Sequence, residues 1–300
     1  MFEILQNDIA PVFSILVLGF FMGRSKVVSR IEASAVNRIA FLILQPALIF
    51  PLINRADLSE FYFDAIALYG VAQSAVFLLT VLIASAVFKC SLVEAWLLGM
   101  ATIFVNSLLY ILPISSLIYG MEGNMPIKSI VIWDAAFTFA FFIITTDLLA
   151  NQQKLSTDTV SRLAKNPVLI FILLGLFTNV FGIAAPEPLM VAFDFAGAGA
   201  APLTLFAIGV ILSEHPLKPT KKIAVFSTIK LLVMPAVVFT LLQFGDRPPV
   251  WDSMLLLNAA GPSGAMAFAL AMLYNVRTET VAPVIIWTSV LTLISLAFLA

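Results

Sequence analysis

Two apolar stretches of the chain are interrupted in the same way: FVNSLLYILP (residues 104–113) and LLNAAGPSG (residues 256–264). Each places Asn, Ser and Pro inside a run of apolar side chains. Proline has no backbone N–H, and its ring collides with the carbonyl one turn earlier, so a helix breaks or kinks there. Within a membrane, the freed backbone groups are tolerated only where they face protein or a water-filled cavity. The two stretches therefore predict a pair of broken helices with a polar site between them.

The remainder of the chain has the composition of a membrane protein. Of its 300 residues, 61% are hydrophobic and 11% are charged, and the mean hydropathy is +1.07. Soluble domains carry about 25% charged residues, so a water-soluble fold could not bury this much apolar surface. The first apolar stretch follows Glu3 and Asp8 instead of a positive segment, and we therefore expect a membrane span there and no cleavable signal.

Composition also limits the chemistry. One His and one Cys cannot form a disulfide framework or a Cys/His metal cluster. The net charge of −1 and the lack of a basic stripe argue against nucleic acid as a partner. There is no P-loop signature, which excludes ATP-driven transport by this chain alone. We expect no cofactor and no metal site, and the expected partners are the lipid bilayer and a small solute.

Ten stretches are long and apolar enough to cross the ~30 Å hydrocarbon core, which needs about 20 residues per helix. They span residues 9–23, 35–53, 62–88, 92–119, 127–150, 168–183, 189–212, 223–244, 250–274 and 280–300.

Basic residues alternate between the two sides of these spans. One set of connections carries twelve Lys and Arg residues, from Arg24 to Arg277, and the other set carries only Arg55, Lys128 and Arg247. Cytoplasmic loops retain Lys and Arg, so the richer set is predicted to be cytoplasmic. We therefore expect a multi-pass protein of the cell (inner) membrane with both termini on the outer, periplasmic side.

The longest polar connection, residues 151–166, lies at the middle of the chain and is predicted to be a cytoplasmic linker. It leaves five spans in 1–150 and five in 167–300, and an odd number inverts the second half. Matching landmarks recur: Asn106 and Asn258 lie 152 residues apart, and Pro113 and Pro262 lie 149 apart. Paired interruptions in two halves indicate an inverted repeat with its binding site at the midplane.

The candidate substrate site is the place where the broken fourth and ninth helices cross. The positive ends of the half-helices would favour an anion there, and the side chains would supply hydrogen bonds. The alternative is an ordinary proline kink whose polar side chains hold helices together. The residues proposed to bind substrate are Asn106, Ser107, Pro113, Asn258, Gly261, Pro262 and Ser263.

Lys230 and Asp134 are charged residues inside predicted spans. Lys230 lies eight residues beyond Lys222, about 12 Å into its span at 1.5 Å per residue. A charge at such a depth costs about 2.5–3.5 kcal/mol, so it should be paired, neutral or facing a cavity. Asp134 is the candidate counter-ion. The pair either couples transport to Na+ or H+ or forms a fixed structural ion pair.

Two other functions fit some of the same residues. An intramembrane serine hydrolase would use Ser263 of the GPSG turn, but a Ser hydroxyl needs an adjacent base. His215 belongs to a loop, which leaves Lys230 as the only conceivable base. A solute channel is the other alternative.

Four motifs resemble the auxin efflux carrier family. The second span carries Asn37 and Arg38 followed by QPALIF (45–50), similar to that family's LN...PaLiF signature. The sixth begins with Asn166 and Pro167, like the family's NP. The stretches APLTLFAIGVIL (201–212) and AAGPSGAMAFALA (259–271) look like its most recognisable segments.

The resemblance implies the fold and mechanism of a bacterial-type member with the bile acid/sodium symporter-like superfamily fold. These are ten transmembrane helices in two inverted five-helix repeats, with the broken fourth and ninth helices crossing at the substrate site. Spans one, two, six and seven would form a scaffold that often makes a homodimer. Spans three to five and eight to ten would form a transport domain that moves by an elevator-like shift. The expected activity is secondary active transport of a small organic anion (carboxylate), and not an enzymatic one.

The chain departs from the family pattern at the proposed crossing. Leu108 and Ile111 stand where the family's fourth span has two glycines, which predicts a tighter crossing or another solute. Ala265 and Met266 replace residues that are commonly polar in the family, which leaves fewer hydrogen-bond donors there.

Overall fold

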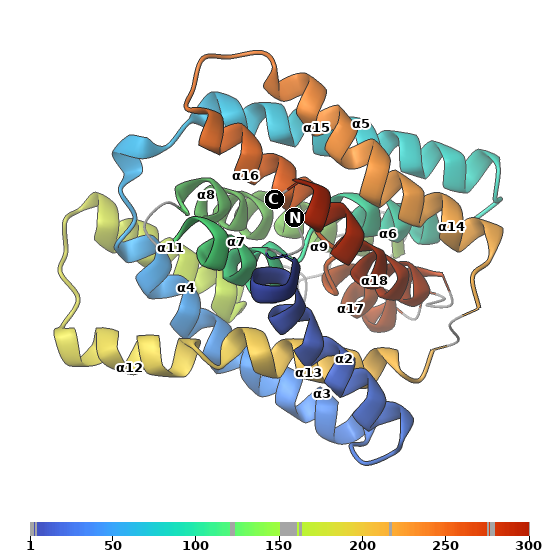
Figure 1. Cartoon of the computed structure of the whole chain (residues 1–300), viewed down its shortest axis with the longest axis horizontal. Coiled ribbons are helices and arrows are strands. Elements are labelled where there is room, and N and C mark those ends of the chain that lie inside the picture. The colour runs from blue at the N-terminus through green and yellow to red at the C-terminus, as the bar shows by residue number, and fades with distance from the viewer. Residues whose placement is uncertain are drawn as a thin grey trace.

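The computed structural model describes residues 3, 5–120, 124–150, 161, 164–215, 218–274, 276 and 280–299. This part of the chain is helical, with no strand beyond one isolated bridge (Figure 1). The α-helices are α2 (Ala10–Arg24), α3 (Arg30–Ile39), α4 (Gln45–Asn54), α5 (Phe63–Ala86), α6 (Leu92–Ile103), α7 (Leu112–Tyr119), α8 (Met125–Trp133), α9 (Ala140–Ala150), α11 (Pro167–Val180), α12 (Glu187–Gly197), α13 (Ala200–Leu212), α14 (Lys221–Thr228), α15 (Met234–Leu242), α16 (Pro249–Ala259), α17 (Met266–Leu273) and α18 (Val281–Leu299). The π-helical segments are η1 (Leu5–Ile9), η2 (Ala40–Leu44), η4 (Ser107–Ile111), η5 (Asp134–Phe139) and η6 (Ile229–Val233), and η3 (Leu58–Glu60) is a 3₁₀ turn.

Several helices continue through their prolines by widening one turn. In each of three spans, the residue before the proline donates its N–H to the carbonyl five residues back: Gln45 to Ala40, Leu112 to Ser107 and Met234 to Ile229. The wider i→i+5 turn accommodates the proline, whose missing N–H would otherwise interrupt the hydrogen bonds of an α-helix. Pro113 accordingly lies in the first turn of α7 and does not interrupt the chain. The prediction that the fourth span breaks at Pro113 was wrong.

Two genuine breaks do occur. One lies between α6 and η4, at residues 104–106, seven residues before Pro113. The other lies between α16 and α17, at residues 260–265, and it contains Pro262 as predicted. The fourth and ninth predicted spans are therefore each divided into two shorter helices.

Within the part of the chain that the structure describes, six helical segments are long and apolar enough to cross a membrane: Leu5–Arg24, Arg30–Asn54, Phe63–Ala86, Met125–Ala150, Glu187–Leu212 and Lys221–Leu242. Shorter apolar helices accompany them, including both halves of the fourth predicted span. Large apolar side chains face outward, with Phe195 88% exposed and Phe63 77% exposed. The chain is thus a multi-pass membrane protein. Its ten crossings and inverted repeat remain predictions.

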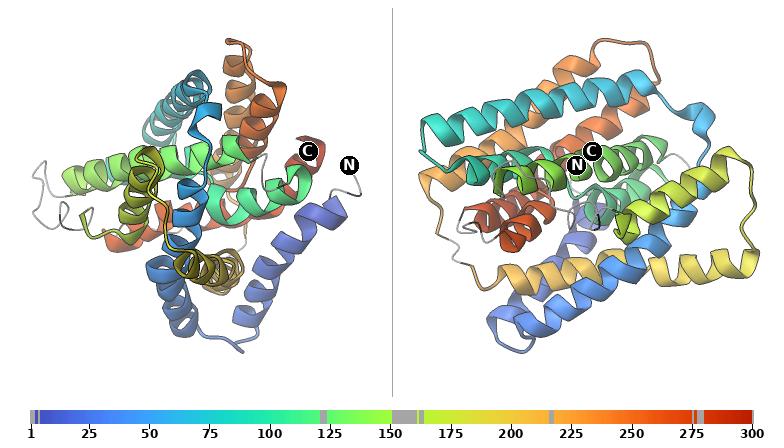
Figure 2. Two further views of the ribbon diagram at one scale, coloured as in Figure 1. Left: turned by 90° about the vertical axis from the view of Figure 1, so that its left-hand side faces the viewer. Right: turned by 180° about the vertical axis from the view of Figure 1, so that it is seen from behind.

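The helices pack in two groups. The first comprises α2, α3, α4, α11, α12 and α13, most of which lie in the lower half of Figure 1. Glycines bring α2 and α13 into backbone contact: a Cβ on Gly19 would lie 2.1 Å from the Phe206 carbonyl oxygen, and one on Gly209 would lie 2.2 Å from that of Leu16. Such small residues allow membrane helices to approach closely. The second group comprises α5 to α9 and α14 to α18, and α5 lies beside α15 (Figure 2).

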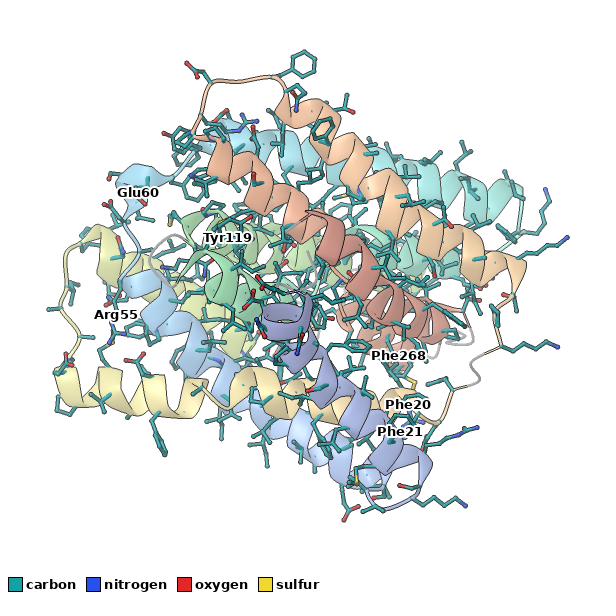
Figure 3. All side chains as sticks on the ribbon, in the orientation of Figure 1. Phe20, Phe21, Arg55, Glu60, Tyr119 and Phe268 are labelled. Carbon is teal, nitrogen blue, oxygen red and sulfur yellow. The ribbon has the colours of Figure 1, made fainter. Side chains whose placement is uncertain are left out.

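Among the described residues, each ion pair joins side chains at the same predicted side of the membrane. Arg30 pairs with Glu214, and Lys222 pairs with Glu94, all at connections predicted to be cytoplasmic. Arg55 pairs with Asp194 at the opposite end. Figure 3 shows the same separation, with Arg55 and Glu60 at one end and Phe20, Phe21 and Phe268 toward the other. Three basic residues used for the orientation, Lys154, Arg162 and Arg277, and most of the linker 151–166 lie outside the described residues.

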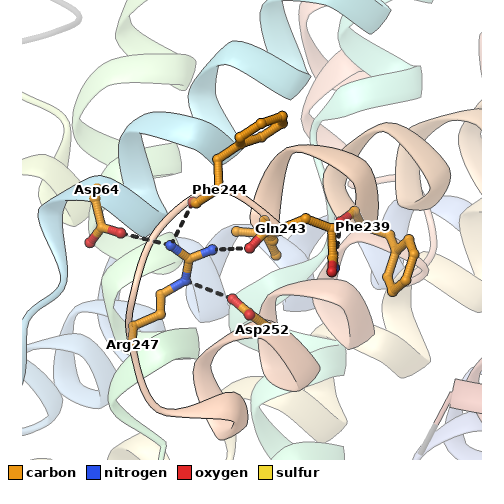
Figure 4. A network of polar contacts seen from close by, with 7 residues as sticks. Asp64, Phe239, Gln243, Phe244, Arg247 and Asp252 are labelled. Carbon is orange, nitrogen blue, oxygen red and sulfur yellow. Dashed lines mark hydrogen bonds and ion pairs between the residues drawn. The ribbon is translucent and has the colours of Figure 1, made fainter.

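Arg247 stabilises the end of the molecule where Arg55 lies (Figure 4). Its guanidinium donates to Asp64 of α5 and to Asp252 of α16, at 2.7 and 2.6 Å. It also donates to the Leu242 and Phe244 carbonyls, which the end of α15 leaves free. One buried guanidinium therefore holds together the ends of three helices.

Candidate functional site

The two helix breaks, at residues 104–106 and 260–265, lie side by side near the centre of the molecule. Val105 and Ser263 form an antiparallel bridge. The Asn106 N–H donates to the Pro262 carbonyl at 3.1 Å, and the Gly264 N–H donates to the Phe104 carbonyl at 2.8 Å. Backbone groups that the breaks remove from helices are thus paired with one another, as an apolar environment requires.

Glycines permit this close approach. A Cβ on Gly261 would lie 2.6 Å from Cδ1 of Ile111, and a Cβ on Gly264 would lie 2.7 Å from the Phe104 ring. Ile111 therefore fills the space beside Gly261, and its side chain tightens the crossing at the position where the family pattern has glycine.

A cavity of about 760 Å³ lies beside the crossing, between the two helix groups. Asn37, Gln45 and Thr204 line it from the first group, and Asn106, Ser107 and Asp134 line it from the second. Most of the remaining wall is apolar, as is typical of small-molecule sites.

Three side chains in this wall carry polar atoms that have no hydrogen-bond partner among the described residues. They are Ser107 Oγ, Thr204 Oγ1 and Asp134 Oδ2, in residues that are at most 4% exposed. Buried polar groups in proteins nearly always have a partner. A solute that offers both donors and acceptors would satisfy them.

The cavity also has positive charge. Arg38 and Lys165 are exposed residues of its lining and lie at connections predicted to be cytoplasmic. Their charges would attract an anion toward the cavity. Of the seven predicted substrate-binding residues, Asn106 and Ser107 line this cavity, while Pro113, Asn258, Gly261, Pro262 and Ser263 do not.

Asn258 is fully buried behind the crossing. Its Nδ2 donates to the Tyr69 hydroxyl at 2.8 Å, and its Oδ1 has no partner. Asn106 and Asn258 therefore lie on elements that meet, but only Asn106 faces the cavity. The two asparagines do not form the symmetric pair of substrate contacts that the sequence predicted, because Asn258 does not line the cavity.

Lys230 and Asp134 are both buried, and no direct ion pair joins them among the described residues. The Lys230 ammonium donates to the Ala259 carbonyl at 2.6 Å. Asp134 Oδ1 accepts from Gln73 at 2.7 Å, and Gln73 in turn accepts from Trp133 at 2.8 Å. The two side chains still interact electrostatically, so the structure brings them to the same region without contact.

Ser263 is held as a structural residue. Its hydroxyl donates to the Ala101 carbonyl at 2.6 Å, and its N–H donates to Thr288 at 3.2 Å. No base contacts its hydroxyl in the described part of the chain. His215 lies in the loop after α13, where its ring packs edge-on against Phe268 at 5.4 Å and burial lowers its pKa. The geometry therefore gives the hydrolase alternative no support.

The sequence reasoning did not identify Thr204, which lines the cavity, nor Gln73 and Tyr69, which are hydrogen-bonded to Asp134 and Asn258. Thr204 lies within the APLTLF motif, from which only the family resemblance was inferred. Gln73 and Tyr69 are one turn apart in α5, on one face of a largely apolar span. A search for polar residues spaced by four within spans would have found them. No group of three potential metal ligands occurs among the residues described.

Comparison with known proteins places the chain in a family. Residues 4–300 match the model of a family described as "Membrane transport protein". A "Putative malonate transporter" of Rhizobium meliloti (strain 1021) is 25% identical over 94% of this chain and 91% of its own. Uncharacterized transporters of Escherichia coli (strain K12) and Methanocaldococcus jannaschii are 24% and 23% identical, over 91% and 97% of this chain and 90% and 96% of theirs.

The match extends over nearly the whole chain, and it confirms the resemblance to the auxin efflux carrier family that the four motifs indicated. The chain belongs to the membrane transport protein family.

Proposed function

We propose that this protein is a secondary active transporter of a small organic anion, a carboxylate, across the cytoplasmic membrane. The observation that carries the proposal is the cavity beside the crossing. Its wall contains three buried polar atoms without a partner among the described residues, and its lining contains two cationic side chains. A carboxylate would be attracted by Arg38 and Lys165 and would accept hydrogen bonds from Ser107 and Thr204. The relative named for malonate agrees with this substrate class.

The position of the cavity supports an elevator-like mechanism of alternating access. Its walls come from both helix groups, which contain the spans expected for a scaffold and for a transport domain. If one group slides past the other, a solute bound at Asn106 and Ser107 moves with the crossing. Asp134, in the same wall, is the candidate group for coupling to H+ or Na+. The scaffold group would be the surface for a homodimer.

Uptake into proteoliposomes tests the proposal. Wild-type protein is expected to accumulate labelled carboxylates saturably, and Asn106→Ala or Ser107→Ala should lower the uptake rate about tenfold, because a hydrogen bond to a charged group contributes roughly 1.5–3 kcal/mol. Ser115→Ala is the matched control, since Ser115 is buried in α7 but bonded to Leu112 and absent from the cavity wall.

The outcomes separate the alternatives. Equal uptake by wild type and both cavity variants would place the solute elsewhere. Unitary currents would indicate a channel, and labelling of Ser263 by a serine-reactive phosphonate, lost in Ser263→Ala, would indicate a hydrolase.

A further inference from the structure

A second cavity of about 760 Å³ shares no lining residue with the first. It is a groove between the helix formed by α14, η6 and α15 and the helix α18, which lie side by side (Figure 1). Its wall is almost wholly apolar, and its apolar lining residues Leu232, Phe239, Leu291 and Ile294 are between 38% and 63% exposed. The groove therefore lies on the outer, lipid-facing surface of the second helix group.

Polar groups occur at one end of this groove and deeper in its wall. Lys218 and Lys221 are exposed residues on either side of Pro219, which lines the groove. Their neighbour Lys222 is already paired with Glu94. Ser227 also lines the groove, is only 4% exposed, and has an Oγ without a hydrogen-bond partner.

The spacing of these features matches the parts of a lipid. Ser227 lies six residues beyond Lys221, about 9 Å deeper along the helix at 1.5 Å per residue. Because a lysine ammonium lies at the end of a flexible four-carbon stem, Lys218 and Lys221 can hold a phosphate above Ser227, with the ester linkages between them. Apolar lining continues on the same helix to Phe239, sixteen residues beyond Ile223 and so about 24 Å along the axis.

We propose that the groove is a binding site for one anionic glycerophospholipid, a property beyond the proposed function. Lys218 and Lys221 bind the phosphate, the Ser227 hydroxyl donates to an ester carbonyl, and an acyl chain lies between α14–α15 and α18. Charge complementarity selects this occupant: two ammonium groups that have no ion pair among the described residues lie at the end of an apolar groove within the membrane.

The site is connected to the crossing through the same helices. Leu231 and Leu232 line the groove, whereas the adjacent Lys230 is turned inward and bonds to Ala259. On the other side, Ser295 lines the groove and donates to the Ala260 carbonyl at 3.3 Å. A bound lipid would thus support the helices whose side chains bond to the backbone at the break between α16 and α17.

Trp287, in the groove wall, provides a direct test. Purified full-length protein in uncharged detergent is titrated with phosphatidylglycerol that carries brominated acyl chains, which quench nearby tryptophan fluorescence. We expect saturable quenching that largely disappears in Trp287→Phe, in which the other three tryptophans remain. Brominated phosphatidylcholine should bind about 30-fold more weakly, and so should phosphatidylglycerol to Lys218→Gln/Lys221→Gln, because each lysine near an anionic lipid contributes about a fivefold factor in affinity.

Two further variants complete the design. Ala224→Phe puts a ring into the groove from an exposed position and should abolish the saturable phase. Lys26→Gln/Lys89→Gln removes two exposed lysines that do not line the groove and should leave it unchanged. Equal quenching by the two lipids, or full affinity in Lys218→Gln/Lys221→Gln, would overturn the proposal and leave ordinary lipid contact. These binding measurements do not depend on whether the protein transports a carboxylate.

Discussion

Gly261→Ala is expected to abolish solute uptake, and Ile111→Ala introduced into the same protein is expected to restore part of it. The added Cβ would lie 2.6 and 2.8 Å from Cδ1 and Cγ1 of Ile111 and 2.9 Å from Cγ1 of Val105. Two of these three atoms belong to one side chain, so its truncation removes most of the collision. Overpacking of this kind costs about 1–3 kcal/mol, and here it acts where the two helix breaks touch.

The pair of substitutions is read as a double-mutant cycle. Thermal unfolding in detergent gives the stability, and proteoliposome uptake gives the function. Coupling is expected, since residues in contact do not contribute additively. Gly199→Ala is the matched control, because the nearest atom to its added Cβ is 3.5 Å away. Additive costs at Gly261 and Ile111 would show that the two side chains are not packed against each other at the crossing.

Lys230→Met and Asp134→Asn are each expected to destabilise the protein by about 1–3 kcal/mol, while the double variant should lose less than the sum. Each substitution removes a buried hydrogen-bonding group and leaves the other charge without the one that opposes it. Lys230 is fully buried and Asp134 is 3% exposed, and the two interact electrostatically without direct contact. Uptake should fall in both single variants, since Lys230 also holds the Ala259 carbonyl beside the break.

Lys128→Met serves as the control for this second prediction. Lys128 is a half-buried lysine at the start of α8, and its loss should cost little. If the stability losses of Lys230→Met and Asp134→Asn simply add, the two charges act independently, and a joint role in coupling would be excluded.

The membrane class and the break in the ninth span could be predicted from sequence because they depend on local properties. Hydropathy identifies helices that cannot be soluble, and GPSG offers two glycines and a proline in four residues. Gly261 and Gly264 are needed there for space as well, a requirement that arises only from the partner segment 104–106.

The break in the fourth span was misplaced because proline was read as a breaker. Leu112 bonds to Ser107 through a widened turn, so the helix tolerates Pro113. The helix is interrupted at residues 104–106, where the backbone pairs with residues 262–264. A long-range pairing of this kind leaves no periodic signal in the sequence, and no rule based on local propensity would find it.

The polar contacts behind the crossing escaped prediction for a similar reason. The sequence identified Asn258 and Asp134, but their partners Tyr69 and Gln73 both come from α5, a distant span. Which buried groups remain unpartnered depends on the packing of all these helices. Ser107 was predicted from the sequence, whereas Thr204 could not be, because the cavity that it lines forms only when the two helix groups pack together.

Protection of a single cysteine in the cavity wall tests the central claim most directly. In a Cys90→Ser background, which removes the single native cysteine, Ser107→Cys places a thiol at the crossing with little change in size. We predict that a maleimide labels this thiol in proteoliposomes and that a transported carboxylate slows the labelling in proportion to its occupancy, while Ser115→Cys stays unlabelled. Labelling of Ser107→Cys that is the same with and without a carboxylate being transported would contradict the account.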